Sequence, residues 1–468
     1  MAPCKHATLF LDVSPNAAEA GFTRPPAAKR RAATSLTGRR IEAETAAAEE
    51  EAVQTLAGTF PGPLVLPDDL LSAYPKDPDS NQSLLSWKES KHRNRLGNNT
   101  NNTIHLTAPP TYSSKMKHVM KNWTTPLTAT RGEENVMPPK TKDLAGYLAA
   151  YYHPLPVTQT PNLSWVPWID DDGSKGGSSQ YIGLKQGANV TRIRTRPCPD
   201  GAYERQLNLS DILDGLLHMV GDGMGGYAVV MVVHHDLYED EEDDFCCGRA
   251  YGGSRVAVVT SSRYHPGLDS YQGIERGHMW PASHCGGFVR RVCGIRPSKK
   301  RKAGRVEKGD GVDGKGTAMR AAVDASVAAP APEKDLAGLW FGRTALTVSH
   351  ELGHCFCLGH CNYYACAMQG TAGIVEDVRQ PPYICLVCLE KVISGFLEVD
   401  EYVKVGRERL VLERYEKLYA FCTDKKRAGV KMFAGYGAWL GKRIETLKAG
   451  NEKSAEPASC IDLTNESE

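Results

Sequence analysis

Apolar and polar residues follow the periods of strands and helices most clearly in the middle of the chain. Residues 190–194 alternate apolar and basic side chains, which predicts a strand. Ser210 then precedes apolar residues that recur every three or four positions, so we expect it to be the N-cap of an amphipathic helix. Residues 227–233 are continuously apolar and β-branched, which is typical of a buried strand, and residues 255–260 predict another strand. A helix between strands in this order predicts an α/β layer.

Helical spacing returns in the last third of the chain. Residues 336–356 contain few helix breakers, and residues 401–422 place their apolar side chains on roughly one side of a helix. By contrast, residues 21–54 are rich in Ala, Arg and Glu without an apolar face, and residues 296–334 are rich in Lys, Gly and Ala. Both compositions predict disorder, and the second stretch is expected to be an insertion between folded parts.

Composition and charge exclude some classes of function. The 468 residues include 56 Lys and Arg against 55 Asp and Glu, and this net charge of +1 argues against a protein that coats nucleic acid or membranes by bulk charge. No apolar run approaches the roughly 20 residues that cross a bilayer, and the N-terminus lacks the pattern of a secretory signal. We therefore expect a soluble intracellular protein. The 14 Cys in such a protein favour metal binding over disulfides.

Residues 349–361 read SHELGHCFCLGHC and contain the first candidate metal site. His350 and His354 are four residues apart on the expected helix, so both imidazoles leave one face and can bind the same Zn²⁺. Glu351 is adjacent to the first histidine, where its carboxylate can take a proton from the attacking water and later deliver it to a leaving amine. His360 would lie about 15 Å along a continued helix, so the chain must turn back to bring it to the metal. Three His ligands and one open position are typical of a hydrolytic zinc site; the alternative is two surface histidines on an ordinary helix.

A second candidate site follows at once. Its residues form C-x4-C followed, after 18 residues, by C-x2-C, namely Cys361, Cys366, Cys385 and Cys388. Paired cysteines at this spacing predict a tetrahedral four-thiolate zinc site, which would be structural because four protein ligands leave no open position. We therefore expect two Zn²⁺ per chain, one catalytic and one structural. The alternative is four unrelated buried thiols.

The residues HELGHCFCLGHCNYYACAM and the later CLVC, from His350 to Cys388, resemble the archaemetzincins, which are intracellular zinc metallopeptidases of the metzincin clan. Weaker similarity extends the resemblance over about residues 163–440, interrupted by the insertion. The resemblance implies that the three histidines hold the catalytic zinc, that Glu351 is the general base and that the four cysteines hold the second zinc. It also implies that Met368 forms a hydrophobic base below the metal, the alternative being an ordinary core methionine.

The fold implied by the resemblance is α/β: a metzincin-like catalytic domain with a mixed β-sheet, an active-site helix and a Cys4 zinc subdomain, together with disordered segments. The expected activity is zinc-dependent hydrolysis of peptide bonds in a peptide or protein substrate. The expected segments are, in chain order, a mostly disordered N-terminal segment (1–58), an irregular region (59–162), the N-terminal part of the catalytic domain (163–295), a disordered basic insertion (296–334), the active-site helix with the Cys4 site and C-terminal helices (335–445), and a disordered tail (446–468).

Substrate binding is expected at one strand by analogy with the metzincins, in which an antiparallel edge strand lines the cleft and pairs with an extended substrate. The residues to which this role is carried over are Arg255, Val256, Ala257, Val258 and Val259. The alternative is that this strand lies in the interior of the sheet.

One residue departs from the family pattern. Archaemetzincins have Gly three residues after the second histidine, where the helix ends, and this chain has Cys357 there. A left-handed backbone at a cysteine costs roughly 1–2 kcal/mol. We expect strain at Cys357, unless Gly359 takes the turn instead. Cys357 itself lies about 10 Å of helix rise from His350, too far to share its metal.

Two short motifs suggest a nuclear role. The basic run from Lys299 to Lys302 is typical of a nuclear localisation signal, or else of a solvated loop, so the expected location is the cytoplasm or the nucleus. The run from Ile461 to Thr464, followed by acids, resembles a motif that adds a strand to small ubiquitin-like modifier, or else is an inert tail. With Cys357, these motifs support an alternative function: a catalytically weak, zinc-stabilised adaptor or binding protein.

Overall fold

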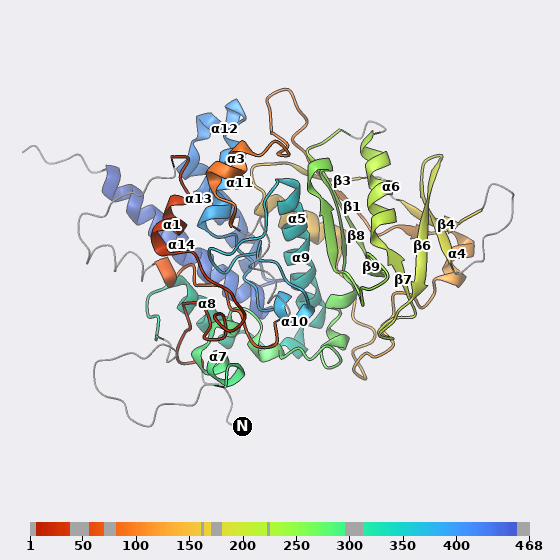
Figure 1. Ribbon diagram of the computed structural model, residues 1–468, viewed down its shortest axis with the longest axis horizontal. Coiled ribbons are helices and arrows are strands. Elements are labelled where there is room, and N and C mark those ends of the chain that lie inside the picture. The colour runs from red at the N-terminus through yellow and green to blue at the C-terminus, as the bar shows by residue number, and fades with distance from the viewer. Residues whose placement is uncertain are drawn as a thin grey trace, which may run out of the picture.

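The computed structural model describes residues 6–37, 56–69, 81–160, 163–169, 180–221, 225–294 and 312–455. It contains two β-sheets and a set of helices (Figure 1). The five-stranded sheet has the order β10-β11-β8-β1-β3, and the six-stranded sheet has the order β2-β4-β5-β6-β7-β9. Helix α6 (Leu209–Gly221) contacts strands of both sheets. The predicted α/β class is therefore correct.

The five-stranded sheet positions the candidate site. Its strands are, in chain order, β1 (Ile104–Thr107), β3 (Val157–Gln159), β8 (Ala228–Val233), β10 (Gly248–Tyr251) and β11 (Val256–Thr260). All neighbouring pairs are parallel except β10 and β11, which are antiparallel. The strands of the six-stranded sheet are β2 (Thr111–Tyr112), β4 (Ser164–Pro167), β5 (Tyr181–Gln186), β6 (Asn189–Pro197), β7 (Arg205–Asn208) and β9 (Asp236–Tyr238).

Strands β8 and β11 of the five-stranded sheet are buried on both faces. Figure 1 shows α5 (Thr141–Tyr151) and α9 (Leu336–Cys355) along one side of the sheet and α6 along the other. Ala257 and Val259 of β11 belong to the core on the α9 side, whereas Val256 and Val258 belong to the core on the α6 side. A strand covered on both faces needs apolar residues at every position, which explains the continuous apolar run.

Figure 1 shows most of the remaining helices on the side of α9 away from the six-stranded sheet, whereas α4 packs on that sheet. They are α1 (Ala27–Ala32), α3 (Leu84–Glu89), α4 (Ser114–Val119), α7 (Gly286–Val292), α8 (Ala318–Ala328), α10 (Ile374–Asp377), α11 (Leu386–Phe396), α12 (Asp400–Val405), α13 (Arg407–Thr423) and α14 (Lys431–Ala455). Helix α14 packs against α8 and α13. No helix among the described residues is long and apolar enough to cross a membrane.

The strand at residues 255–259 was expected at the sheet edge, and this expectation is wrong. β11 is hydrogen-bonded to β10 on one side and to β8 on the other. The edge strand is β10, whose residues are partly or fully exposed. Arg255 precedes β11 in a left-handed conformation with φ +62°. Because β11 is already paired on both sides, a substrate strand cannot join it.

Three expectations about the character or the bounds of the segments are also wrong. The region 59–162 is not irregular, because it supplies β1 and β3 of the central sheet. The expected disordered insertion at 296–334 contains α8, which packs closely on α14 through small residues: a side chain at Gly435 would lie 3.1 Å from the carbonyl oxygen of Ala322. The tail cannot begin at residue 446, since α14 continues to Ala455.

Smaller corrections concern helix ends and the N-terminus. The N-cap of α6 is Asn208, whose Oδ1 accepts from the amide of Asp211 at 3.1 Å, and not Ser210. The helix expected at 401–422 is broken at Gly406, where φ is +85°. Part of the expected disordered segment 1–58 is folded, as Leu9 is buried in the main core. The motifs at 299–302 and 461–464 lie outside the described residues, so both stay predictions.

Candidate metal centres

Three histidine side chains come together at the end of α9. His350 and His354 lie one turn apart on the helix, and their Nε2 atoms are 3.1 Å apart. The ring of His360, from the following loop, has its centroid 5.5 Å from that of His350 and 5.0 Å from that of His354. One ring nitrogen from each of the three lies within 4.8 Å of the others. The chain thus turns back after α9 as the sequence predicted.

The other nitrogen of each helical histidine is anchored to the backbone. His350 Nδ1 lies 2.6 Å from the carbonyl oxygen of Ala367, and His354 Nδ1 lies 2.7 Å from that of Leu358. A carbonyl only accepts, so each Nδ1 carries the proton and each Nε2 keeps its lone pair. Burial lowers the pKa of His350 to about 4, which keeps its imidazole neutral. Neutral imidazoles with oriented Nε2 atoms are the donor set that a zinc ion binds, so the residues fit this metal.

The turn that brings His360 back begins at Cys357. The amide of Cys357 donates to the carbonyl of His354 at 2.8 Å, and the amide of Leu358 donates to that of Gly353 at 3.1 Å. These two bonds form a Schellman motif, in which the residue after the C-cap is left-handed. Cys357 has φ +58°, and Gly359 does not take a positive φ. Cys357 therefore has the strained left-handed backbone that was expected, and the alternative, in which Gly359 takes the turn, is excluded.

We expect Cys357→Gly to stabilise the protein by about 1 kcal/mol, because glycine adopts the left-handed conformation without the steric cost of a Cβ. Urea unfolding of the two proteins measures the difference. The matched control is Cys293→Gly at the C-cap of α7, where φ is −79° and glycine brings no relief. Equal or lower stability of the Cys357 variant would mean that the thiol contact with Ser90 Oγ, at 3.6 Å, outweighs the strain.

Glu351 lies between α9 and the edge strand. Its side chain is 7% exposed, and a Cβ at Gly248 of β10 would be 3.2 Å from Glu351 Oε1. Burial raises the pKa of Glu351 to about 8; Asp377 acts in the same direction, and Arg249 opposes it. A buried carboxyl with a pKa near neutrality is suited to both accepting and releasing a proton.

Met368 lies beneath the histidine-bearing helix. A Cβ built on Gly353 would be 2.4 Å from Met368 Sδ, so the thioether packs directly against the helix backbone between the two ligand positions. Met368 is buried in the main core together with Leu352 and Leu358. Its expected role as a hydrophobic base below the metal stays a prediction.

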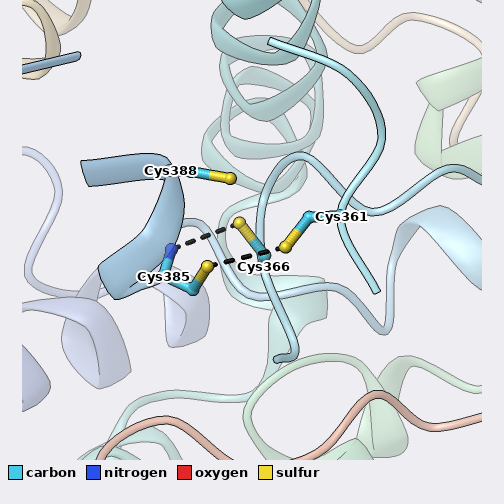
Figure 2. A group of neighbouring side chains, drawn as sticks. All are labelled: Cys361, Cys366, Cys385 and Cys388. Atoms are coloured by element: carbon cyan, nitrogen blue, oxygen red, sulfur yellow. Dashed lines mark hydrogen bonds between the residues drawn. The ribbon is translucent and has the colours of Figure 1, made fainter. Parts of the chain in front are cut away.

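The four cysteines predicted as a second site also converge (Figure 2). Cys361 and Cys366 come from the loop after α9, whereas Cys385 and Cys388 come from the start of α11, and all four are buried. The Sγ atoms of Cys361 and Cys385 are 3.6 Å apart, and the amides of Cys385 and Met368 donate to Cys366 Sγ at 3.2 and 3.4 Å. Amide donors and a helix N-terminus favour thiolates, and a buried thiolate cluster needs a cation. The set fits a tetrahedral zinc.

An open cleft of about 870 Å³ gives solvent access to the histidines and Glu351. Its wall includes residues of and next to β10, with Phe245, Gly248 and Arg249 among them. Tyr264 also lines the cleft; its hydroxyl donates to Asp377 Oδ2 at 2.6 Å and accepts from Thr347 Oγ1 at 2.7 Å. No motif pointed to these residues. The only sequence signal was the weaker similarity over about residues 163–440, within which these residues lie.

Comparison with known proteins yields matches around the histidine and cysteine clusters. The model of peptidase family M54 matches residues 330–394. Archaemetzincin-2 of Macaca fascicularis is 42% identical over 67 residues, which are 14% of this chain and 19% of that relative. The archaemetzincin of Sulfolobus acidocaldarius is 38% identical over 53 residues, 11% of this chain and 30% of that relative. The matched segments thus span less than a third of these relatives.

Solved structures were compared as well. The archaemetzincin of Methanopyrus kandleri aligns with a TM-score of 0.30 at 15% identity, covering 64% of this chain and 98% of that one. A zinc-dependent peptidase from Methanocorpusculum labreanum aligns with a TM-score of 0.27 at 15% identity, covering 62% of this chain and 99% of that one.

Proposed function

We propose that the protein is a zinc-dependent peptidase. The premise is that residues 330–394 of this chain belong to peptidase family M54, the family of the archaemetzincins. The observation that carries the proposal is the convergence of three imidazoles beside a buried glutamate in an open cleft. His350, His354 and His360 would hold the catalytic zinc. Zinc in this position supplies Lewis-acid chemistry, by which the scissile carbonyl is polarised and the pKa of a water is lowered.

Glu351 is the general base and then the general acid. Its carboxylate takes a proton from the attacking water and delivers it to the amine that leaves. Burial and the neighbouring Asp377 raise the pKa of Glu351, which makes its carboxylate a better proton acceptor. Arg249 and Gly248 of the edge strand bound the same side of the cleft as Glu351.

The extended substrate joins β10 rather than β11. One side of β10 pairs with β11, while its other side is a sheet edge. An open strand edge can bind peptide backbone by strand addition, and alternate side chains of the peptide then enter the cleft. The substrate-binding role first carried over to residues 255–259 is thereby transferred to Gly248–Tyr251.

The second zinc is structural. Cys361, Cys366, Cys385 and Cys388 supply four ligands, so no position remains for substrate. A zinc ion held by these cysteines would tie the loop that carries His360 to the start of α11. Two zinc ions per chain are therefore proposed, with separate tasks.

A peptide library tests the proposal. We expect the full chain to cleave peptides when loaded with zinc, to lose cleavage when the metal is chelated, and to regain it when zinc is added back. A hydroxamate should inhibit cleavage because it binds zinc with an open coordination position. Mass spectrometry of the products identifies the cleaved bonds. Metal-loaded protein that cleaves nothing, or cleavage that persists without metal, would contradict the proposal.

A further inference from the structure

Residues 81–94 cross the loop that carries His360, although they lie more than 200 residues earlier in the chain and outside the matched segment. Trp87 Nε1 donates to the carbonyl of Phe356 at 2.8 Å, before the turn. Tyr363 donates its hydroxyl proton to the carbonyl of Asn81 at 2.5 Å, after His360. The loop is thus held from outside on both sides of the third histidine.

Gln82 contacts the turn itself. Its Nε2 donates to the carbonyl of Cys357 at 3.0 Å, and its Oε1 accepts from the amide of Gly359 at 3.1 Å. The same Oε1 accepts from Lys391 Nζ at 2.9 Å. Lys391 is only 2% exposed and belongs to α11, the helix that carries Cys388. One carboxamide therefore connects the histidine turn with the helix of the cysteine cluster.

The carboxamide can satisfy these three contacts in one orientation only. The groups facing Oε1 are an amide N–H and an ammonium, which both donate, and the group facing Nε2 is a carbonyl, which only accepts. A flipped amide would oppose donor to donor and acceptor to acceptor. Gln82 thus specifies the positions of both Cys357 and Gly359, the latter being the residue directly before His360.

We propose that Gln82 is a positioning residue for the metal site: by bridging the strained turn at Cys357 it holds His360 within reach of His350 and His354. The inference rests on the proposed function, as it assumes that the three histidines bind a metal. Partners that orient metal ligands typically contribute about 10- to 100-fold to metal affinity. Without the bridge, the left-handed Cys357 can relax, and His360 is the ligand that moves.

Two variants separate the contacts. Gln82→Met has a similar length and removes all three hydrogen bonds. Gln82→Glu keeps the acceptors for Gly359 and Lys391 but replaces the donor to Cys357 with an acceptor. The matched control is Ser83→Ala. It removes the N-cap of α3, where Ser83 Oγ accepts from the Ser86 amide at 3.1 Å, and it leaves the turn at Cys357 unchanged.

The test is a chelator titration of the full chain loaded with cobalt. Cobalt at the four-thiolate site shows sulfur-to-metal charge-transfer absorption, which cobalt bound to histidines lacks, so the two sites are followed separately. We expect Gln82→Met to weaken cobalt binding at the histidine site by about 10-fold or more and Gln82→Glu to weaken it less. Ser83→Ala should lower Tm and leave cobalt affinity unchanged.

Wild-type affinity at the histidine site in both Gln82 variants would overturn the inference and leave the proposed function standing. Wild-type protein that binds cobalt at the histidines and cleaves no peptide would overturn the proposed function, while the titration would still decide the role of Gln82. A wild type with no metal at the histidines would overturn both.

Discussion

Replacing Glu351 with glutamine is expected to leave both zinc ions bound and to lower kcat by about 10²- to 10⁴-fold, the contribution typical of a general acid–base residue. The amide has nearly the same shape as the carboxyl group but cannot accept a proton from water. None of the seven proposed ligands is changed, so the metal content should stay at the wild-type value. Steady-state kinetics on a cleaved peptide and metal analysis of the same sample measure the two quantities.

Stability should move in the opposite direction from activity. Because burial raises the pKa of Glu351 to about 8, its carboxyl group must take up a proton on folding at neutral pH, and the neutral amide removes this cost. We therefore expect Glu351→Gln, without metal, to unfold at an equal or higher temperature than the wild type. The control is Glu239→Gln, the same chemical change in the same cleft, where Glu239 pairs with Arg249 at 2.7 Å. The kcat of Glu239→Gln should fall by less than about 10-fold. Undiminished cleavage by Glu351→Gln would refute the mechanism.

The convergence of the candidate metal ligands could be predicted because their arrangement is encoded over short distances in the chain. His350 and His354 share a helix face by the geometry of the helix alone, and the cysteine spacing is itself a signature of a zinc site. The resemblance to the archaemetzincins, based on the same residues, is confirmed by the family match at 330–394. The position of His360 also followed, since only a turn after α9 could bring it back.

The cleft wall and Gln82 could not be predicted, because segments far apart in the sequence bring them to the site. Nothing in the sequence next to Gln82 distinguishes it from an ordinary polar residue. Its role follows from the contact of its side chain with residues 357–359 in the folded chain. The edge strand was missed for a related reason. Residues 255–259 had the stronger strand pattern, but a strong apolar run marks a strand covered on both faces, and an edge strand such as β10 has weaker periodicity.

Short or alanine-rich elements were missed as well. β1 and β3 have four and three residues, too few to show a period of two. Helix α8 buries Ala318, Met319, Ala322 and Val323, and its mostly small side chains are hard to tell from a low-complexity linker. Helix α8 packs closely against α14, which lies about 100 residues later in the chain.

Replacing Cys388 with serine is expected to release the structural zinc and to lower the free energy of unfolding by more than about 4 kcal/mol, as loss of a structural metal belongs among the largest single-residue effects. Cys388 lies in the first turn of α11, and its cluster joins this helix to the loop between α9 and α11. Without the fourth thiolate, three buried sulfurs lose the cation that balances their charge. Urea unfolding and metal analysis measure the change.

The matched control is Cys422→Ser, the same exchange at a fully buried cysteine of α13 that is outside the metal-binding groups of the described residues. It places a hydroxyl group in the core, which costs about 1–3 kcal/mol, and should keep the full zinc content. Because His360 directly precedes Cys361, we also expect Cys388→Ser to weaken metal binding at the histidines. Equal losses of stability in the two variants, with one zinc ion per chain in both variants and in the wild type, would mean that the four sulfurs pack as ordinary core thiols and hold no metal.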